Sequence, residues 1–161
     1  MRGKVLIVED YTDWRDLLSG ILRREGLDVE TAGSLQEARD VLQKSKDLDL
    51  AILDIRLVET DETNEDGMRL LSEIRRKQEF TRVIMITGHG TMEMQRKAFR
   101  EYKAFDFFRK EQFDSGDFRQ GVQEAVQEAA RDRQQSKDKG YMHEHRFERW
   151  QKENQGPLKE D

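Results

Sequence analysis

Residues 50–57 read LAILDIRL, an apolar run that stops at an aspartate, and this stretch decides the fold. A strand that is apolar throughout, without polar alternation, is typical of a sheet buried on both faces. Comparable runs occupy residues 5–8, 83–86 and 104–108, and a weaker one spans 27–31. The pattern therefore predicts five strands of a sheet that is covered on both sides.

The segments between these runs have the three-to-four-residue spacing of amphipathic helices. Ser34 followed by Glu37 is the pattern of a capping box at the start of one of them. The predicted helices contain residues 14–22, 35–42, 68–75, 92–100 and 118–129. Strands that alternate with helices favour a five-stranded, parallel, doubly wound α/β domain over about residues 3–130. In such sheets the ligand site lies at the carboxyl ends of the strands.

The composition excludes several kinds of protein. The chain has 161 residues, no Cys and three His, which excludes disulfide frameworks, thiol nucleophiles and Cys-based metal sites. No apolar stretch approaches the roughly 18 residues of a membrane span, and no signal-peptide core is present, so we expect a cytoplasmic protein without membrane contact. The net charge of −5 argues against direct nucleic-acid binding.

The composition changes after residue 130. Residues 131–161 hold eight basic and seven acidic residues and few large apolar ones. We expect a charged C-terminal tail or helix with no recognisable output domain, since it is too short for a typical DNA-binding domain and has no helix-turn-helix pattern. A solvated tail and a terminal helix remain equal alternatives. On a helix, Phe147 and Trp150 lie one turn apart. Together with Tyr141 and Met142 they are expected either to pack on the surface of the preceding domain or to pair with a second chain as a homodimer.

Polar residues follow four of the predicted strands. They are Glu9 and Asp10 after the first, Asp54 after the third, Thr87 after the fourth and Lys110 after the fifth. Three carboxylates at one edge repel each other unless a cation joins them, and Mg²⁺ with retained waters fits such a set. A lysine and a hydroxyl stabilise the oxygens of a transferring phosphoryl group, and Asp54 could be the nucleophile that forms an acyl phosphate.

As an ordered set these motifs resemble the response-regulator receiver domains of two-component signalling, of the chemotaxis-regulator type. The matching residues are Glu9–Asp10 after VLIV, Asp54 in AILDIRL, Thr87 in VIMITGHG and Lys110 in FDFFRK. The resemblance covers residues 1–130 as the receiver domain and implies a flavodoxin-like fold and a signalling role rather than an enzyme. A dehalogenase-type phosphatase also uses a strand-end Asp, but it needs a second Asp where this chain has Arg56.

The resemblance implies a role for each residue of the acidic edge. Asp54 accepts the phosphoryl group, and Lys110 is its catalytic partner. Glu9, Asp10, Asp54 and the backbone carbonyl of Arg56 bind Mg²⁺. The phosphoryl group comes from a histidine kinase or phosphotransfer protein, and the output passes to a downstream protein target.

The resemblance also implies a switch. Thr87 moves to hydrogen-bond the phosphoryl group, and Phe107 rotates inward as it does so. Permanent burial of Phe107 in the core is the alternative. Arg56 and His89 occupy positions that modulate the lifetime of the phosphoryl group, unless they are simply exposed polar side chains.

Two features depart from the family pattern. Asp54 and Gly67 are thirteen residues apart, where the family uses about eight, and the insert 58–66 reads VETDETNED with five acids. It is either a solvated loop or a shield for the site. Glu111 stands where the family has a proline joined by a cis bond, so we expect a trans bond with a rerouted loop or a strained cis one. Both departures favour an alternative function, a receiver-like interaction module that no longer turns over phosphate.

Overall fold

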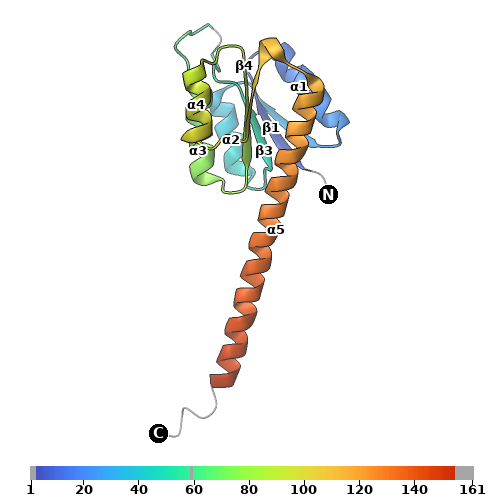
Figure 1. The fold of residues 1–161 in the computed structure, drawn as a ribbon, viewed down its shortest axis with the longest axis vertical. Coiled ribbons are helices and arrows are strands. Elements are labelled where there is room, and N and C mark those ends of the chain that lie inside the picture. The colour runs from blue at the N-terminus through green and yellow to red at the C-terminus, as the bar shows by residue number, and fades with distance from the viewer. Residues whose placement is uncertain (1–2, 59, 155–161) are drawn as a thin grey trace. The chain divides into compact units, whose positions relative to one another are not determined.

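The fold is a five-stranded parallel sheet with helices on both faces, as the sequence predicts (Figure 1). The structure is a computed structural model that describes residues 3–58 and 60–154, apart from the side chains of residues 141–145 and 154. The strand order is β2-β1-β3-β4-β5, which places β3 at the centre. In chain order the elements are β1 Lys4–Val8, α1 Thr12–Arg24, β2 Asp28–Ala32, α2 Leu35–Lys44, β3 Leu50–Leu53, α3 Asp66–Lys77, β4 Arg82–Thr87, α4 Met92–Arg100, β5 Asp106–Arg109, the 3₁₀ turn η1 Lys110–Gln112 and α5 Ser115–Asn154.

Successive side chains of the central strands point to opposite faces of the sheet and feed two separate cores. On one face, α2, α3 and α4 cover the sheet; on the other, α1 and the first turns of α5 do so. Leu53 of β3 belongs to the first core and Ile52 to the second, and both are fully buried. The complete burial of β1 and β3 past their first residues explains why their sequences lack polar alternation.

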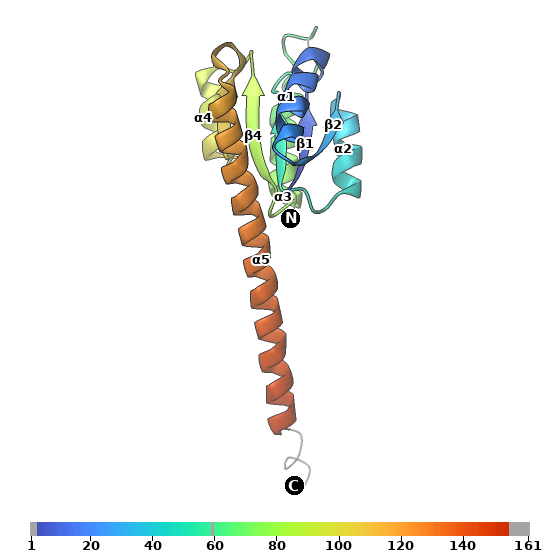
Figure 2. The same ribbon diagram turned by 90° about the vertical axis from the view of Figure 1, so that its right-hand side faces the viewer.

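The strands run in the same direction, so their carboxyl ends share one edge. Figure 2 shows the arrows of β1, β2 and β4 pointing in this common direction. Val8 pairs with Leu53, and Leu53 pairs with Met85. Thr87 in turn pairs with Arg109, the residue before Lys110. The register therefore brings the residues that follow β1, β3, β4 and β5 to one rim.

Two boundaries differ from the sequence prediction. The fifth strand begins at Asp106 and not at residue 104, because Lys103 has a left-handed backbone (φ 55°) that turns the chain after α4. The third helix begins at Asp66 and so includes Gly67, which the sequence pattern places just before the helix.

The chain divides into two compact units, Met1–Ala130 and Arg131–Asp161, each of which is described by itself. The first unit holds the sheet, and the start of α5 contributes buried apolar residues to it. In the second unit the described residues, 131–154, are helical, so the helix rather than a frayed tail is found there. The rings of Phe147 and Trp150 stack with 6.1 Å between their centroids, and both residues are more than half exposed. Over the described residues, every helix is too short or too polar to cross a membrane.

Candidate functional site

Three acidic side chains meet at the carboxyl edge of the sheet. Glu9 and Asp10 follow β1, Asp54 follows β3, and each offers a carboxylate oxygen within 4.8 Å of the others. Glu9 and Asp54 are fully buried, and Asp10 is partly exposed. The structure thus brings together the three carboxylates that the sequence places at strand ends.

Lys110 reaches into this acidic cluster of Glu9, Asp10 and Asp54. Its Nζ donates to Asp54 Oδ2 at 2.8 Å and lies 2.9 Å from Glu9 Oε2. The peptide bond between Lys110 and Glu111 is trans, and the chain continues through η1. Of the two routes expected for a chain without proline here, the trans one is found, and the lysine still reaches its partners.

The charges of the cluster perturb one another. Burial raises the pKa of the Glu9 carboxyl to about 8, and the Asp54 carboxylate adds to the shift, while Lys110 opposes it. Burial would lower the pKa of Lys110, but the Asp54 and Glu9 carboxylates outweigh it and the net pKa is raised. The site is therefore short of positive charge, since a single ammonium faces three carboxyl groups.

The unmet hydrogen-bonding capacity fits a hard divalent cation. Asp54 Oδ1 is buried and has no hydrogen-bond partner among the described residues. Three carboxyl groups close together, with the unsatisfied Asp54 Oδ1 among their oxygens, are the donors that Mg²⁺ takes alongside retained waters. The acidic cluster is thus a candidate Mg²⁺ site, and it needs no other residue type to be one.

Backbone contacts hold Glu9 in place. The amide of Tyr11 donates to Glu9 Oε1 at 3.1 Å, and the Arg15 guanidinium donates to the Glu9 backbone carbonyl at 2.9 Å. Arg15 lies on α1, so it ties the start of that helix to the rim. Sequence reasoning misses Arg15, because a single Arg on a helix carries no signal of which carbonyl it contacts.

Thr87 and Phe107 lie beside each other under the loop that follows β4. Thr87 is fully buried, and its hydroxyl oxygen accepts a hydrogen bond from the His89 amide at 3.2 Å. A Cβ added to Gly90 would lie 2.9 Å from Phe107 Cζ and 3.0 Å from Thr87 Cγ2. Phe107 is 8% exposed and contacts Phe99 at 6.4 Å between ring centroids. The ring is thus buried in this conformation, and its rotation stays a prediction.

Gly67 lets α3 start directly against the residues that follow β3. Its amide donates to the Ile55 carbonyl at 2.8 Å, and an added Cβ would lie 1.7 Å from the Asp54 carbonyl oxygen. No side chain fits in that space. The sequence shows Gly67 as the end of the insert, but the reason for it appears only in the packing.

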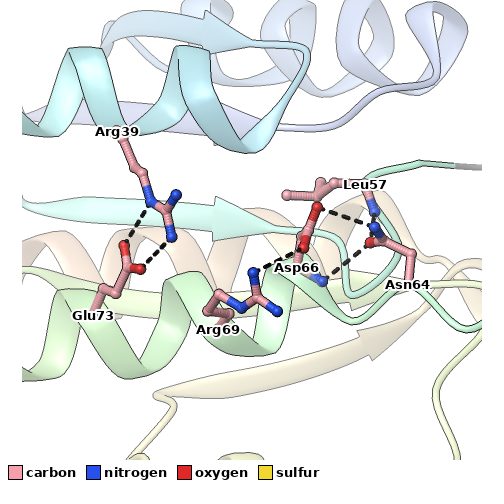
Figure 3. A network of polar contacts seen from close by, with 6 residues as sticks. All are labelled: Arg39, Leu57, Asn64, Asp66, Arg69 and Glu73. Carbon is pink, nitrogen blue, oxygen red and sulfur yellow. Dashed lines mark hydrogen bonds and ion pairs between the residues drawn. The ribbon is translucent and has the colours of Figure 1, made fainter.

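The described part of the insert is folded, not loose. Asn64 Oδ1 accepts from the amides of Leu57 and Asp66 at 3.0 and 3.1 Å, and its Nδ2 donates to Asp66 Oδ2 at 3.0 Å (Figure 3). Asn64 therefore closes the loop and accepts a hydrogen bond from the amide of Asp66, the first residue of α3. The same view shows Arg39 of α2 paired with Glu73 of α3, which ties the two helices together.

Arg56 lies two residues beyond Asp54, and its side chain turns toward the insert. Its guanidinium donates to the Glu62 backbone carbonyl at 3.5 Å, and the residue is partly exposed. The predicted metal contact of its own carbonyl, and the effects of Arg56 and His89 on phosphoryl lifetime, stay predictions.

Comparison with known proteins shows which proteins this chain resembles in sequence and in fold. The family model described as the response regulator receiver domain matches residues 5–123. Sporulation initiation phosphotransferase F of Bacillus subtilis (strain 168) is 30% identical over 122 residues, which cover 76% of this chain and 92% of that protein. A CheY-like receiver domain protein from Methanospirillum hungatei JF-1 superposes with a TM-score of 0.72 at 25% identity, covering 82% of this chain and 99% of that one.

Longer proteins match over the same region. The response regulator protein PilR of Pseudomonas aeruginosa is 36% identical over 109 residues, which cover 68% of this chain but 23% of that protein. The chain thus spans about a quarter of the length of this relative.

Proposed function

Because this chain belongs to the family of response regulator receiver domains, we propose that it accepts a phosphoryl group on Asp54 and signals through the resulting change of its surface. The observation that carries the proposal is the arrangement of Asp54, with one oxygen held by Lys110 and the other buried without a hydrogen-bond partner. Glu9 and Asp10 stand beside it in one cation-binding cluster.

The reaction follows from these contacts. An Asp54 carboxylate oxygen attacks phosphorus, the phosphorus–nitrogen bond of a phosphohistidine breaks, and the imidazole leaves with the electron pair and takes up a proton from solvent. Lys110 stays charged and moves its hydrogen bond from the carboxylate to a phosphoryl oxygen. Bound Mg²⁺ would be held by Glu9, Asp10 and Asp54 and would neutralise charge on the phosphoryl oxygens. Burial of Asp54 keeps bulk water away from the attacking oxygen.

The output side of the proposal uses Thr87 and Phe107. After transfer, the Thr87 hydroxyl turns from the His89 amide to the phosphoryl group. The methyl group of Thr87 lies near Gly90, which the Phe107 ring also approaches. A shift of Thr87 therefore changes the room available to Phe107 and alters the surface near α4 and β5.

Partners and domain limits are part of the same proposal. We assign residues 1–130 to the receiver and residues 131–161 to a charged extension. A histidine kinase or phosphotransfer protein supplies the phosphoryl group, and a protein target reads the switched surface. The exposed Phe147 and Trp150 on the extension are the residues through which a second copy would pair.

Labelling with acetyl phosphate and Mg²⁺ tests the function. Wild type should acquire one acid-labile phosphoryl adduct that EDTA prevents. Asp54→Asn should acquire none, and Asp40→Asn, an exposed aspartate on α2, should behave as wild type. Equal labelling of Asp54→Asn, or none of wild type, would overturn the proposal; the second result would favour a receiver-like module that no longer turns over phosphate.

A further inference from the structure

The indole ring of Trp14 lies over the Lys110 ammonium. Nζ is 5.1 Å from the ring centroid, inside the range of about 6 Å for a cation–π contact. Trp14 belongs to α1 and Lys110 follows β5, so the contact joins two elements at the rim of the sheet. Lys110 thus has carboxylates and an aromatic face as neighbours.

The core fixes the orientation of this ring. The Phe113 ring meets the Trp14 ring edge-on, with 5.4 Å between the ring centroids and an interplanar angle of 88°. The centroid of the Phe113 ring lies 5.5 Å from that of the Phe118 ring. Phe118 of α5 is fully buried in the core between α1 and the sheet. A row of three rings therefore runs from the core to the ammonium, and Trp14 has little freedom to turn away.

No proline constrains the backbone directly after Lys110. The family pattern places a cis-proline after the lysine, whereas here Glu111 follows through a trans bond and a single 3₁₀ turn. The carboxylate contacts of the ammonium also change during the reaction, because Asp54 becomes an acyl phosphate. The indole neither titrates nor reacts, so its attraction for the cation is the same before and after transfer.

We propose that Trp14 is a positioning residue that holds the Lys110 ammonium at the acidic cluster during phosphoryl transfer. This inference rests on the proposed function of Asp54. Trp14 itself touches neither the carboxylates nor the phosphoryl group in this account.

The test measures the rate of Asp54 phosphorylation by phosphoramidate at saturating donor and Mg²⁺. Trp14→Leu should slow the step by about 3- to 10-fold, and Trp14→Phe, which keeps an aromatic face, should stay within about twofold of wild type. Tyr102→Leu is the matched control, since its ring lies over a different ammonium, that of Lys97, with Nζ 5.9 Å from the ring centroid. It should leave the rate unchanged.

A second arm separates positioning from a general loss of structure. In the Lys110→Met background Trp14→Leu should cause no further slowing, because the cation that the ring holds is gone. The inference is overturned if wild type and Trp14→Leu are labelled at the same rate. It is also overturned if Trp14→Leu slows labelling equally in the wild-type and Lys110→Met backgrounds. Wild type that takes no label overturns the proposed function itself.

Discussion

Lys110 Nζ lies 2.8 Å from Asp54 Oδ2, although no proline follows the lysine to shape the backbone. The lysine side chain is 13% exposed and the Asp54 side chain is fully buried. A buried ion pair of this kind costs desolvation, and Glu9 Oε2, 2.9 Å from Lys110 Nζ, is a further oxygen partner for the ammonium. The pair is therefore the electrostatic centre of the site.

Removing the ammonium should destabilise the domain. Lys110→Met leaves Glu9 and Asp54 buried side by side without their cation, which should cost roughly 3 kcal/mol of unfolding free energy at neutral pH. Urea unfolding in EDTA measures it. Lys4→Met is the control, because the Lys4–Asp47 pair is as short at 2.7 Å but lies at the surface, so its loss should change little. Equal effects of the two variants would contradict the account.

Metal-free stability should fall as the pH rises from about 5 to 8. The pKa of Glu9 is raised from 4.5 to about 8 in the folded protein, mainly by burial, so the folded state keeps a proton that the unfolded chain releases. Its contribution is fully present below pH 4.5 and is lost as the pH passes through about 8, with a slope of at most about 1.4 kcal/mol per pH unit. Unfolding at several pH values measures this slope.

Glu9→Gln and Mg²⁺ are the controls for this pH dependence. The variant has no titrating group at position 9, so its slope between pH 5 and 8 should be nearly flat. Excess Mg²⁺ should flatten or reverse the wild-type slope, since the cation binds the ionised carboxylates. A Glu9→Gln slope equal to that of wild type would assign the effect to other groups.

Gly67 should tolerate no side chain. A Cβ there would lie 1.7 Å from the Asp54 carbonyl oxygen, so Gly67→Ala must push α3 away from the end of β3, at a cost above about 3 kcal/mol. Gly20→Ala in α1 is the control, because its added methyl would meet only Arg24 Nη2 at 3.8 Å and should not lower stability. Thermal unfolding of both variants measures their stability relative to wild type. A Gly67→Ala protein as stable as wild type would show that α3 does not pack this closely against Asp54.

Gly90 and Phe107 should be energetically coupled. Gly90→Ala brings a methyl group to within 2.9 Å of Phe107 Cζ, which should cost about 1–3 kcal/mol through overpacking. Phe107→Leu shortens the side chain and should relieve this clash, so the double variant should be more stable than the sum of the single effects predicts. Strict additivity in chemical denaturation would show that the ring does not pack under this loop.

Much of the fold could be predicted from the sequence, because burial on both faces leaves strands without polar alternation. The Ser34 cap could also be predicted from the sequence, and Ser34 Oγ accepts a hydrogen bond from the Glu37 amide at 3.2 Å. The start of β5 could not be predicted from the sequence, since it depends on the left-handed turn at Lys103. Apolar residues at 104–105 pack in the turn itself and give the same signal as a strand.

The acidic cluster and Lys110 could be predicted for a different reason. Parallel strands end at one edge, so residues directly after each strand meet whatever the loops do. The contacts of Trp14, Arg15 and Asn64 could not be predicted from the sequence, because each contact depends on the path of a loop or the rotation of a helix. Their residue types alone indicate no partner.

The identity of the phosphoacceptor is the central claim, and borohydride reduction tests it most directly. An aspartyl phosphate formed with acetyl phosphate and Mg²⁺ is reduced to homoserine, which peptide mass spectrometry locates by position. The account predicts homoserine at position 54 alone, with the peptides that contain Glu9 and Asp10 unchanged. Reduction at Asp10, or at no acidic residue of a labelled protein, would contradict it.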